Sequence, residues 1–432
     1  MNKPFAITLD VGSSLANRTG SWRTVKPVYV NRLPPCNAKC PAGEQCQAWL
    51  FHAESGDYES AWKKITEDNP FPATMGRVCY HTCEGACNRA DLDESVGINA
   101  VERFLGDHAL EKGWAFTKAA PTGKRVLVVG AGPAGLSAAY HLARMGHAVD
   151  VVDGAEAPGG MMRYGIPKYR LPREILDKEI ARIEALGVTI RMNHKVEDLQ
   201  AEMTAGGYDA VFLGTGATLA RRAYIPAGDS THILDAVSVL RSMEGEEKPL
   251  LGRKVVVYGG GNTAIDVART ARRLGAEPVV VYRRTRDRAP AHAFEIEEAL
   301  EEGVSMKWLS TIAQAEKGEI RIEKMKLDES GYPQPTGEYE TVEADTVVLA
   351  LGQQSNLSFL EKIEGLEIDR DVLKVDENFA TGVPGIYAGG DMVPGDRNVT
   401  AAIGHGKRAA RAIDAFLKGE VYKAPEPAAP AT

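Results

Sequence analysis

The sequence VLVVGAGPAGLSAAYHLARMG at residues 126–146 joins an apolar run, a glycine-rich turn and a helical stretch. The apolar run predicts a buried parallel strand. In the turn Gly130-x-Gly132-x-x-Gly135, the first glycine allows a tight bend and the second lets the backbone approach a pyrophosphate. The third lets the helix pack closely on the strand, and the helix N-terminus faces the phosphates with its partial positive charge.

A second strand, HAVDVVD, ends at Asp153, 18 residues after Gly135. A carboxylate at this place can accept hydrogen bonds from a ribose. A lone GxGxxG also occurs by chance in loops. Because strand, helix and acid are all in place here, the stretch predicts a dinucleotide site.

A second opening of the same kind occurs at KVVVYGGGN, residues 254–262, and continues into a helical stretch. The strand that follows, EPVVVY, ends in Arg283-Arg284-x-x-x-Arg288 rather than in an acid. Arginine accommodates the 2′-phosphate of NADP, whereas a carboxylate would favour NAD. We therefore expect a lower KM for NADPH than for NADH, a gap that replacing Arg283 and Arg284 by alanine should narrow. NAD(H) stays an alternative, as does a run of arginines that simply faces solvent.

All six cysteines lie between positions 36 and 87, as Cys36-x3-Cys40-Pro-x4-Cys46 and Cys79-x3-Cys83-x3-Cys87. Thiolates that hold an inorganic cluster must lie close together, and a following proline often accompanies a cluster-ligating cysteine. If the second triplet is helical, its cysteines lie along one face. Zinc and disulfides remain the alternatives.

Composition limits the functions that this chain can have. Its formal net charge is −8, which argues against nucleic acid as the main partner. The first residues lack the apolar core of a secretory signal, and no apolar run reaches the roughly 20 residues of a membrane span. We expect a cytoplasmic protein without a membrane partner, in which clustered cysteines bind metal more often than they form disulfides.

The expected fold is α/β, with two Rossmann-like dinucleotide-binding domains preceded by an α-helical iron–sulfur domain. The predicted division places the cysteine-bearing helices at 1–118 and the two parts of the first dinucleotide domain at 119–245 and 344–417. The second dinucleotide domain is predicted at 246–343, and a flexible tail at 418–432.

The strings PGGMMRYGIPKYRLP (158–172) and GIYAGGDMV (385–393) carry a family resemblance. From Cys36 to about Leu417 the chain resembles the small subunit of glutamate synthase and its relatives. These relatives include the amino-terminal part of dihydropyrimidine dehydrogenase and the large subunit of NADH-dependent ferredoxin:NADP oxidoreductase. The resemblance implies FAD in the first dinucleotide domain and NADP(H) in the second.

Fingerprint and resemblance together predict the residues of each site. The predicted FAD residues are Gly130, Gly132, Pro133, Ala134, Gly135, Asp153, Gly159, Gly160, Met161, Arg170, Val196, Gly390, Asp391 and Thr400. The predicted NAD(P) residues are Gly259, Gly260, Gly261, Asn262, Thr263, Arg283, Arg284, Arg288 and Gly352. Gly352 is placed near the nicotinamide end by resemblance alone. The formal glycosylation acceptor at 398–400 is interpreted as part of the flavin loop.

The related proteins hold two [4Fe–4S] clusters with interleaved ligands. Carried over, the resemblance assigns Cys36, Cys40, Cys46 and Cys87 to one cluster. The other would need Cys79, Cys83, Glu102 and the residue at position 50. That residue is Leu50, which cannot ligate iron. One cluster is therefore expected and the second stays open, with Glu102 either an oxygen ligand or a surface residue.

These sites predict an FAD- and iron–sulfur-containing NAD(P)H oxidoreductase subunit in a hetero-oligomer. Because the cofactors carry the chemistry, no catalytic side chain is required. The expected partner is ferredoxin or the redox subunit of a ferredoxin-linked 2-oxoacid oxidoreductase or reductase complex. The small subunit of NADPH-dependent glutamate synthase is the alternative. A non-enzymatic redox-sensing or assembly module is an alternative of another class. The lack of cysteine after residue 87 excludes the redox CxxC of a thioredoxin-reductase-like enzyme.

Overall fold

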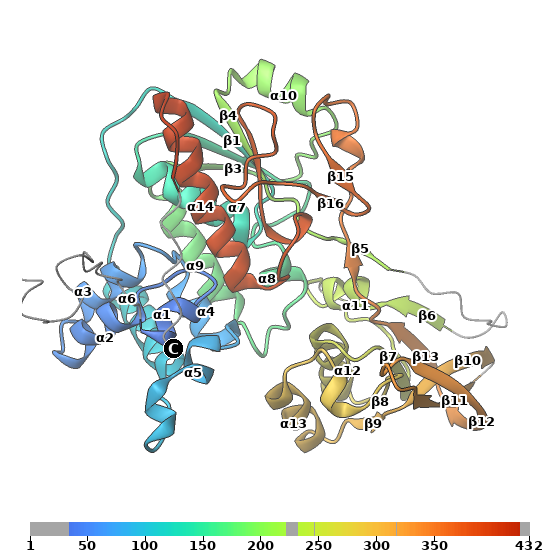
Figure 1. The fold of residues 1–432 in the computed structure, drawn as a ribbon. Coiled ribbons are helices and arrows are strands. Elements are labelled where there is room, and N and C mark those ends of the chain that lie inside the picture. The colour runs from blue at the N-terminus through green and yellow to red at the C-terminus, as the bar shows by residue number, and fades with distance from the viewer. Residues whose placement is uncertain (1–33, 222–231, 246, 317, 424–432) are drawn as a thin grey trace, which may run out of the picture.

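The computed structural model describes residues 34–221, 232–245, 247–316 and 318–423. Residues 1–33 of the predicted cysteine-bearing domain and 424–432 of the predicted tail lie outside this description. The described residues form two five-stranded parallel sheets, a three-stranded antiparallel sheet, two short ribbons and a group of N-terminal helices (Figure 1).

The first sheet has the order β17–β4–β1–β2–β3, and all of its strands run parallel. Strand β1 lies at its centre between β4 and β2, and the apolar residues of β1 and β4 are buried. The strands are β1 (Arg125–Val129), β2 (Ala148–Val152), β3 (Thr189–Arg191), β4 (Ala210–Leu213) and β17 (Ile386–Ala388).

Two long helices, α7 (Pro133–Arg144) and α14 (Val399–Lys418), pack against each other beside this sheet (Figure 1). At Gly406 a Cβ atom would lie 2.2 Å from the carbonyl oxygen of Ala134, so only glycine allows this approach. The remaining elements of this part are α8 (Met161–Tyr164), α9 (Arg173–Glu184), α10 (Leu199–Gly206), η5 (Ser358–Leu360), β15 (Ile368–Asp369), β16 (Val372–Leu373) and η6 (Gly390–Met392).

The second sheet has the order β6–β13–β7–β8–β9 and is also parallel. Helices cover one face, and the antiparallel sheet β10–β11–β12 shares a buried apolar core with the other. The strands are β6 (His232–Asp235), β7 (Lys254–Tyr258), β8 (Glu277–Val281), β9 (Ser305–Lys307), β10 (Ser310–Glu316), β11 (Glu319–Leu327), β12 (Pro333–Glu343) and β13 (Thr346–Leu349). The helices are α11 (Ala236–Ser242), α12 (Asn262–Arg273), η4 (Arg286–Arg288) and α13 (Ala293–Glu301).

A short antiparallel ribbon of β5 (Leu219–Ala220) and β14 (Gln353–Gln354) joins the two parts. The predicted boundaries at 245 and 343 therefore do not match the sheet pairing. Strands β6 and β13, predicted to lie in the first domain, pair in the second sheet. An apolar run such as TVVL suits any buried parallel strand, so its sequence does not indicate which sheet it joins. We place the division at the ribbon.

The described residues 34–118 form helices without a strand. The second cysteine triplet does not form one continuous helix, so the condition under which its cysteines would share one face is not met. Cys79 and Cys87 are extended, and His81 between the first two cysteines has a φ of 46°. The helices are α1 (Pro35–Lys39), α2 (Cys46–Glu54), α3 (Tyr58–Ile65), α4 (Pro72–Val78), α5 (Thr82–Gly85), η3 (Asn88–Asp91) and α6 (Ile98–Lys112).

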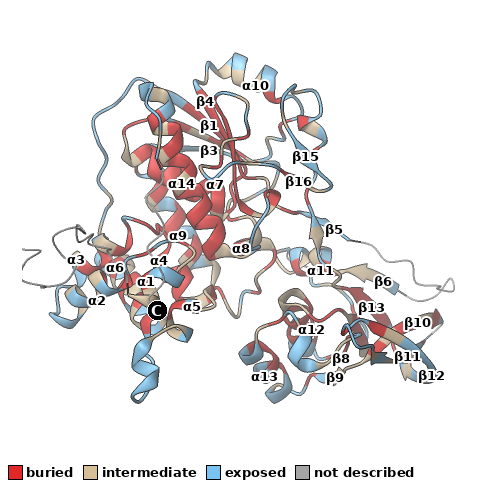
Figure 2. Cartoon of the chain, viewed as in Figure 1, coloured by how far each residue is buried: buried red, intermediate tan, exposed pale blue. Residues whose placement is uncertain are grey.

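Helix α4 fuses the cysteine-bearing helices to the first dinucleotide-binding part. Phe71, Met75 and Val78 belong to the apolar core of the first sheet, whereas Trp49 and Leu105 belong to a smaller core of their own. Figure 2 shows this burial as continuous red along α7 and α14 and as smaller patches among the N-terminal helices. The cysteines are therefore anchored to the fold that carries the first glycine turn.

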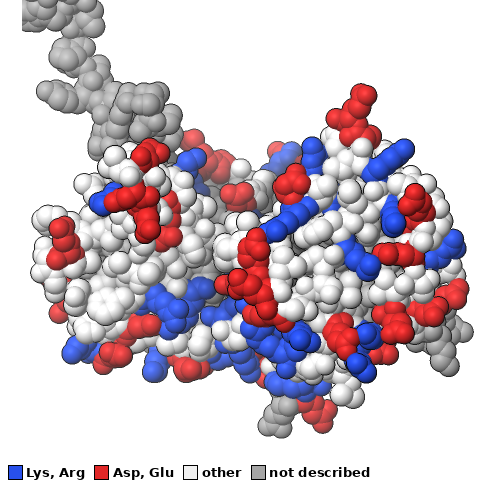
Figure 3. Space-filling model, turned by 90° about the horizontal axis from the view of Figure 1, so that it is seen from below, with Lys and Arg blue, Asp and Glu red and all other residues white. Residues whose placement is uncertain are grey.

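Within the residues that the structure describes, none of the helices has the length and apolar character that crossing a lipid bilayer requires. Seen from below, the surface carries acidic and basic side chains intermixed over the right-hand part of the molecule (Figure 3). Uncharged side chains predominate at the left, on the side of the cysteine-bearing helices.

Candidate dinucleotide and cluster site

One cavity of about 1060 Å³ runs between the carboxyl ends of the two parallel sheets. This is the place where ligands bind in open parallel sheets. The predicted FAD residues in its wall are Gly130, Gly132, Pro133, Ala134, Asp153, Gly160, Met161, Arg170, Val196, Gly390, Asp391 and Thr400. The predicted NAD(P) residues in the same wall are Gly261, Asn262, Thr263 and Gly352. The structure thus brings both glycine turns to one continuous space.

The first glycine turn has the geometry that its spacing predicts. A Cβ atom on Gly135 would lie 1.8 Å from the carbonyl oxygen of Gly130, so glycine is required for the close contact of helix and turn. At Gly132 the nearest atom to such a Cβ would be 3.8 Å away, which leaves the backbone open toward the cavity. Asp153 accepts hydrogen bonds from the amides of Ala131 at 2.7 Å and Ala155 at 2.8 Å. Its carboxylate therefore holds the turn while facing the cavity.

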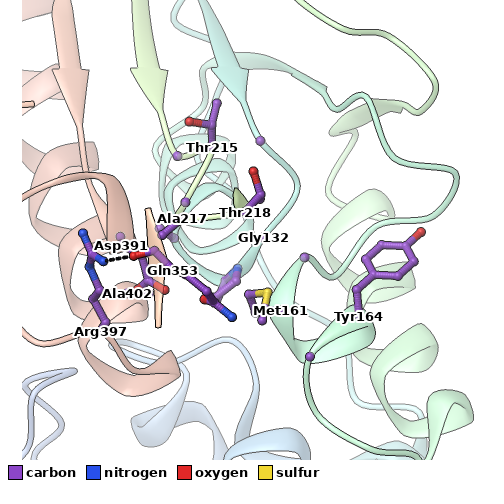
Figure 4. A pocket seen from close by; sticks show the side chains of 18 of the residues that line it. Gly132, Met161, Tyr164, Thr215, Ala217, Thr218, Gln353, Asp391, Arg397 and Ala402 are labelled. Carbon is purple, nitrogen blue, oxygen red and sulfur yellow. Dashed lines mark hydrogen bonds between the residues drawn. The ribbon is translucent and has the colours of Figure 1, made fainter. Parts of the chain in front are cut away.

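The GGD loop closes the other side of this cavity. Figure 4 shows Asp391 and Arg397 across the cavity from Met161 and Tyr164 on α8. Burial raises the pKa of Asp391 to about 6. The Gly390 amide donates to Nδ1 of His405 at 3.2 Å, and burial lowers the pKa of His405 to about 4. The imidazole is therefore neutral at pH 7 and can accept this hydrogen bond.

Several cavity residues were not found from the sequence. They follow β4, β13 or η6 or flank Cys79, and they are Val78, Tyr80, Gly214, Thr215, Gly216, Ala217, Thr218, Gln353 and Arg397. The string FLGTGAT at 212–218 contains a usable signal, because it is an apolar strand followed by two glycines. No comparable signal marks Tyr80, whose place depends on the loop between two cysteines.

The second glycine turn is held by contacts from two other segments. Asn262 Nδ2 donates to the hydroxyl of Tyr80 at 2.7 Å, and Asn262 Oδ1 accepts from the amide of His292 at 3.0 Å. The rings of Tyr80 and His292 stack with centroids 3.7 Å apart. The loop between Cys79 and Cys83 therefore touches the turn that begins α12.

The segment that contains Arg170 also crosses between the two parts. Arg170 Nη1 lies 2.8 Å from both carboxylate oxygens of Asp266 on α12, and Nη2 lies 2.6 Å from Glu295 Oε1 on α13. The guanidinium of Arg273 lies 3.6 Å from the ring centroid of Tyr169. Arg170 lines the cavity, and its guanidinium also contacts Asp266 and Glu295 of the second domain.

The predicted arginines after β8 divide into two groups. Arg284 and Arg288 line a smaller cavity of about 390 Å³ together with Ser330, Gly331 and Tyr332. Arg283 is exposed. Gly259 and Gly260 shape the turn behind this site, since a Cβ on either would meet neighbouring atoms within 2.4 Å.

All six cysteines are free of disulfides. The thiol of Cys46 contacts those of Cys40 and Cys83, and this contact lowers the pKa of Cys40 to about 7. The ligand sets carried over from the resemblance assign Cys46 and Cys83 to different clusters, and this assignment stays a prediction. Among the described residues, no three histidine, cysteine or acidic side chains are placed as a ready metal site.

Glu102 is buried, which excludes the alternative of a surface residue. Asn69 Nδ2 donates to Glu102 Oε1 and to Glu44 Oε1, each at 2.9 Å. Burial raises the pKa of Glu102, and the nearby carboxylate of Glu44 raises it further. Leu50 packs against the small core that contains Cys46 and Cys83.

The wall of the main cavity also touches a cysteine. Thr400, in the first turn of α14, donates a hydrogen bond to Cys79 Sγ at 3.4 Å. The amide of His81 donates to the same sulfur at 3.4 Å.

Two family models match the chain. Residues 124–406 match the pyridine nucleotide-disulphide oxidoreductase family. The chain belongs to this family. Residues 30–114 match dihydropyrimidine dehydrogenase domain II, 4Fe-4S cluster. This pyridine nucleotide-disulphide oxidoreductase thus combines an FAD- and NAD(P)-type fold with a cysteine domain of the [4Fe–4S] type.

Curated relatives match over most of the chain. It is 39% identical over 425 residues to NADP(+)-dependent formate dehydrogenase subunit beta of Moorella thermoacetica, covering 89% of this chain and 60% of the relative. It is 33% identical over 450 residues to NADPH-Fe(3+) oxidoreductase subunit beta of Geobacter sulfurreducens (strain DL-1 / KN400), covering 92% of this chain and 66% of the relative. It is 33% identical over 420 residues to the glutamate synthase (NADPH) small chain of Escherichia coli (strain K12), covering 89% of each. The chain therefore spans less than two thirds of the first two relatives.

Solved structures share the fold. FprA of Mycobacterium tuberculosis in complex with NADPH superposes with a TM-score of 0.57 at 20% identity, over 71% of this chain and 88% of that chain. Thioredoxin reductase of Lactococcus lactis gives a TM-score of 0.55 at 21% identity, over 68% and 99%. These likenesses confirm the predicted pair of dinucleotide-binding folds.

The residues present fit the cofactors that the family implies. The main cavity, with its volume of about 1060 Å³ and the open space next to the Gly132 backbone, can hold a dinucleotide such as FAD. The first turn of α12 offers a second anion-binding end to the same cavity. Six cysteines free of disulfides on the N-terminal helices and the loops between them would supply the sulfur ligands of an iron–sulfur cluster.

Proposed function

We propose that this chain is the FAD- and NADPH-binding electron-transfer subunit of an oxidoreductase complex. The observation that carries the proposal is the single cavity lined by both glycine turns, with Cys79 in contact with its wall. When bound, FAD supplies the exchange of a hydride with NADPH and of single electrons with a cluster. The protein has to bind, orient and shield these groups.

The residues of the cavity divide this work. The backbone amides at the start of α7 and α12 each face a pyrophosphate site. Asp153 fixes the first turn and offers its remaining lone pairs to a ribose. Arg284 and Arg288 supply positive charge for the 2′-phosphate of NADPH. The Tyr80–Asn262 and Arg170–Asp266 contacts hold the second domain against the cavity.

We propose that the chain acts within a hetero-oligomer in the cytoplasm. The relatives named as subunit beta or small chain support a partner chain. Electrons would leave near the cysteine-bearing helices, toward ferredoxin or the redox subunit of a ferredoxin-linked complex. The small-chain relative supports the second candidate, glutamate synthase. Co-purification decides between a glutamine-amidotransferase partner and ferredoxin-linked subunits.

The test is to purify the chain without oxygen and to measure FAD, iron, acid-labile sulfide and zinc. About four iron atoms per FAD would mean one [4Fe–4S] cluster, and about eight would mean two. NADPH should bleach the flavin and electrons should pass to an artificial acceptor. Zinc without iron, or a flavin that NADPH does not reduce, would refute electron transfer and favour a sensing or assembly module.

Cofactor choice has a test of its own. We expect a lower KM for NADPH than for NADH, and the double substitution R284A/R288A should narrow this ratio. The exposed Arg283 gives the control for the single substitutions, because R283A removes one positive charge, as R284A or R288A does, but away from the smaller cavity. Equal KM values in the unmodified chain would contradict the assignment to NADP, and an equal effect of R283A would contradict the placement of the 2′-phosphate at Arg284 and Arg288.

A further inference from the structure

Thr400 is the point at which the main cavity and the second cysteine triplet share a hydrogen bond. Its hydroxyl donates to Cys79 Sγ at 3.4 Å, and the residue is 5% exposed. Val78 and Tyr80, on either side of Cys79, line the same cavity. The hydrogen bond from Thr400 to Cys79 Sγ therefore connects the cavity wall to the cysteine-bearing helices.

The fold fixes the position of this hydroxyl. Asn398 caps α14 by accepting a hydrogen bond from the Ala401 amide at 2.8 Å, which orients the first turn. One turn further on, a Cβ on Gly404 would lie 2.2 Å from the carbonyl oxygen of Pro41. Helix α14 is therefore pressed against the segment that follows Cys40, and Thr400 cannot move away without separating these backbones.

The same sulfur has a second hydrogen-bond donor. The backbone amide of His81 lies 3.4 Å from Cys79 Sγ. His81, which donates this hydrogen bond, has a positive φ of 46°. Two hydrogen-bond donors thus face one half-buried thiol. A half-buried thiol needs neither donor for packing, whereas a ligating thiolate is stabilised by both.

Hydrogen bonds to ligating sulfurs are among the factors that set the reduction potential of an iron–sulfur cluster. One-electron reduction adds one negative charge, part of which falls on these sulfurs. A donor therefore stabilises the reduced form more than the oxidised form, and its removal makes the potential more negative.

We propose that Thr400 is a positioning residue that acts through Cys79 to raise the reduction potential of a cysteine-held iron–sulfur cluster. This proposal rests on the function proposed above. The proposal gives Thr400 a role in setting the cluster potential, in addition to its predicted place in the FAD site. The wall of the dinucleotide cavity would then tune the one-electron acceptor nearest to it.

The test compares four full-length chains purified without oxygen: wild type, T400V, T400S and T215V. Valine removes the hydroxyl and keeps the shape, and serine restores the hydroxyl. Thr215 is the matched control, because it lines the same cavity and its hydroxyl also lies 3.4 Å from a sulfur atom, that of Met392. Met392 is not among the predicted cluster ligands, so T215V removes a similar hydrogen bond away from the cysteines. The cluster midpoint potential is measured by redox titration followed by electron paramagnetic resonance.

We expect a more negative potential in T400V, and wild-type potentials in T400S and T215V. An unchanged potential in iron-loaded T400V, or an equal shift in T215V, would overturn the role of Thr400 alone. A wild-type chain without iron and sulfide would overturn the cluster itself, and this proposal with it. If T400V loses iron, T400A is measured in its place, with the same expected direction.

Discussion

Replacing Arg170 by methionine tests the ionic contact that joins the two dinucleotide-binding domains. The Arg170 side chain is 13% exposed and lies 2.8 Å from both oxygens of Asp266 and 2.6 Å from Glu295. The side chains of Asp266 and Glu295 are 9% and 2% exposed. Methionine keeps much of the length and removes the charge, so two buried carboxylates lose their common cation.

Removing one partner of a buried ion pair costs about 3–5 kcal/mol of unfolding free energy. The cost should depend on pH. Burial already raises the pKa of Glu295 to about 7 and raises the pKa of Asp266, and loss of the guanidinium raises both further. A carboxyl with a higher pKa in the folded state binds more protons there, so stability falls as pH rises between the unfolded and folded values. The deficit of R170M should therefore be larger at pH 8 than at pH 5.

The assay is urea unfolding followed by circular dichroism at both pH values. The variants are R170M, D266N and the double variant, which together form a double-mutant cycle. Arg221 provides the matched control, because it pairs with Asp371 at 2.9 Å but is 50% exposed. R221M should cost less than about 1 kcal/mol.

The reasoning would be refuted by an R170M deficit that is as small as that of R221M and does not change with pH. Additive effects of R170M and D266N would refute it as well, since residues in direct contact should show a coupling energy. Either result would mean that the two domains do not rest against each other through this contact.

Two further substitutions test other contacts. Y80F removes the hydroxyl that accepts a hydrogen bond from Asn262 Nδ2 at 2.7 Å. The loss of one hydrogen bond, about 0.5–1.5 kcal/mol, should raise the Kd for NADP⁺ by about 2- to 10-fold. An unchanged Kd in a binding titration would contradict this expectation. Glu179, whose two oxygens accept the amides of Ala73 and Thr74 at 2.8 Å, has a pKa raised by burial to about 7. Because this pKa exceeds the unfolded value, up to about 3 kcal/mol of stability should be lost between pH 5 and pH 8. E179Q should lack this loss, and an equal pH dependence in the variant would exclude Glu179 as its source.

The glycine turns could be predicted because they are local. The three glycines of the first turn stand at fixed spacings, and each spacing corresponds to one steric requirement within a strand, a bend and a helix. Gly135 meets the carbonyl of Gly130, and Gly132 is open toward the cavity, as that spacing requires. Two such turns in one chain were enough to predict two parallel sheets.

Contacts between distant segments could not be predicted in this way. Arg170 and Asp266 are separated by 96 residues, and nothing in either local pattern refers to the other. The apolar sequence of strand β13 would fit a buried position in either parallel sheet. The spacing of Cys79, Cys83 and Cys87 would suit one helix, but a left-handed backbone at His81 breaks it, and no glycine or proline there marks the break.

The second dinucleotide-binding domain is held against the rest of the molecule by two contacts that a single rotation of this domain would break together. Its covalent link is the ribbon of β5 and β14, with two residues in each strand. The contacts of Arg170 with Asp266 and of Tyr80 with Asn262 both end within the first two turns of α12. Because α12 begins at the glycine turn that faces the nucleotide site, any rotation about the ribbon that moves this turn away must break both contacts. Nucleotide binding and the cysteine loop are therefore linked through the position of one helix.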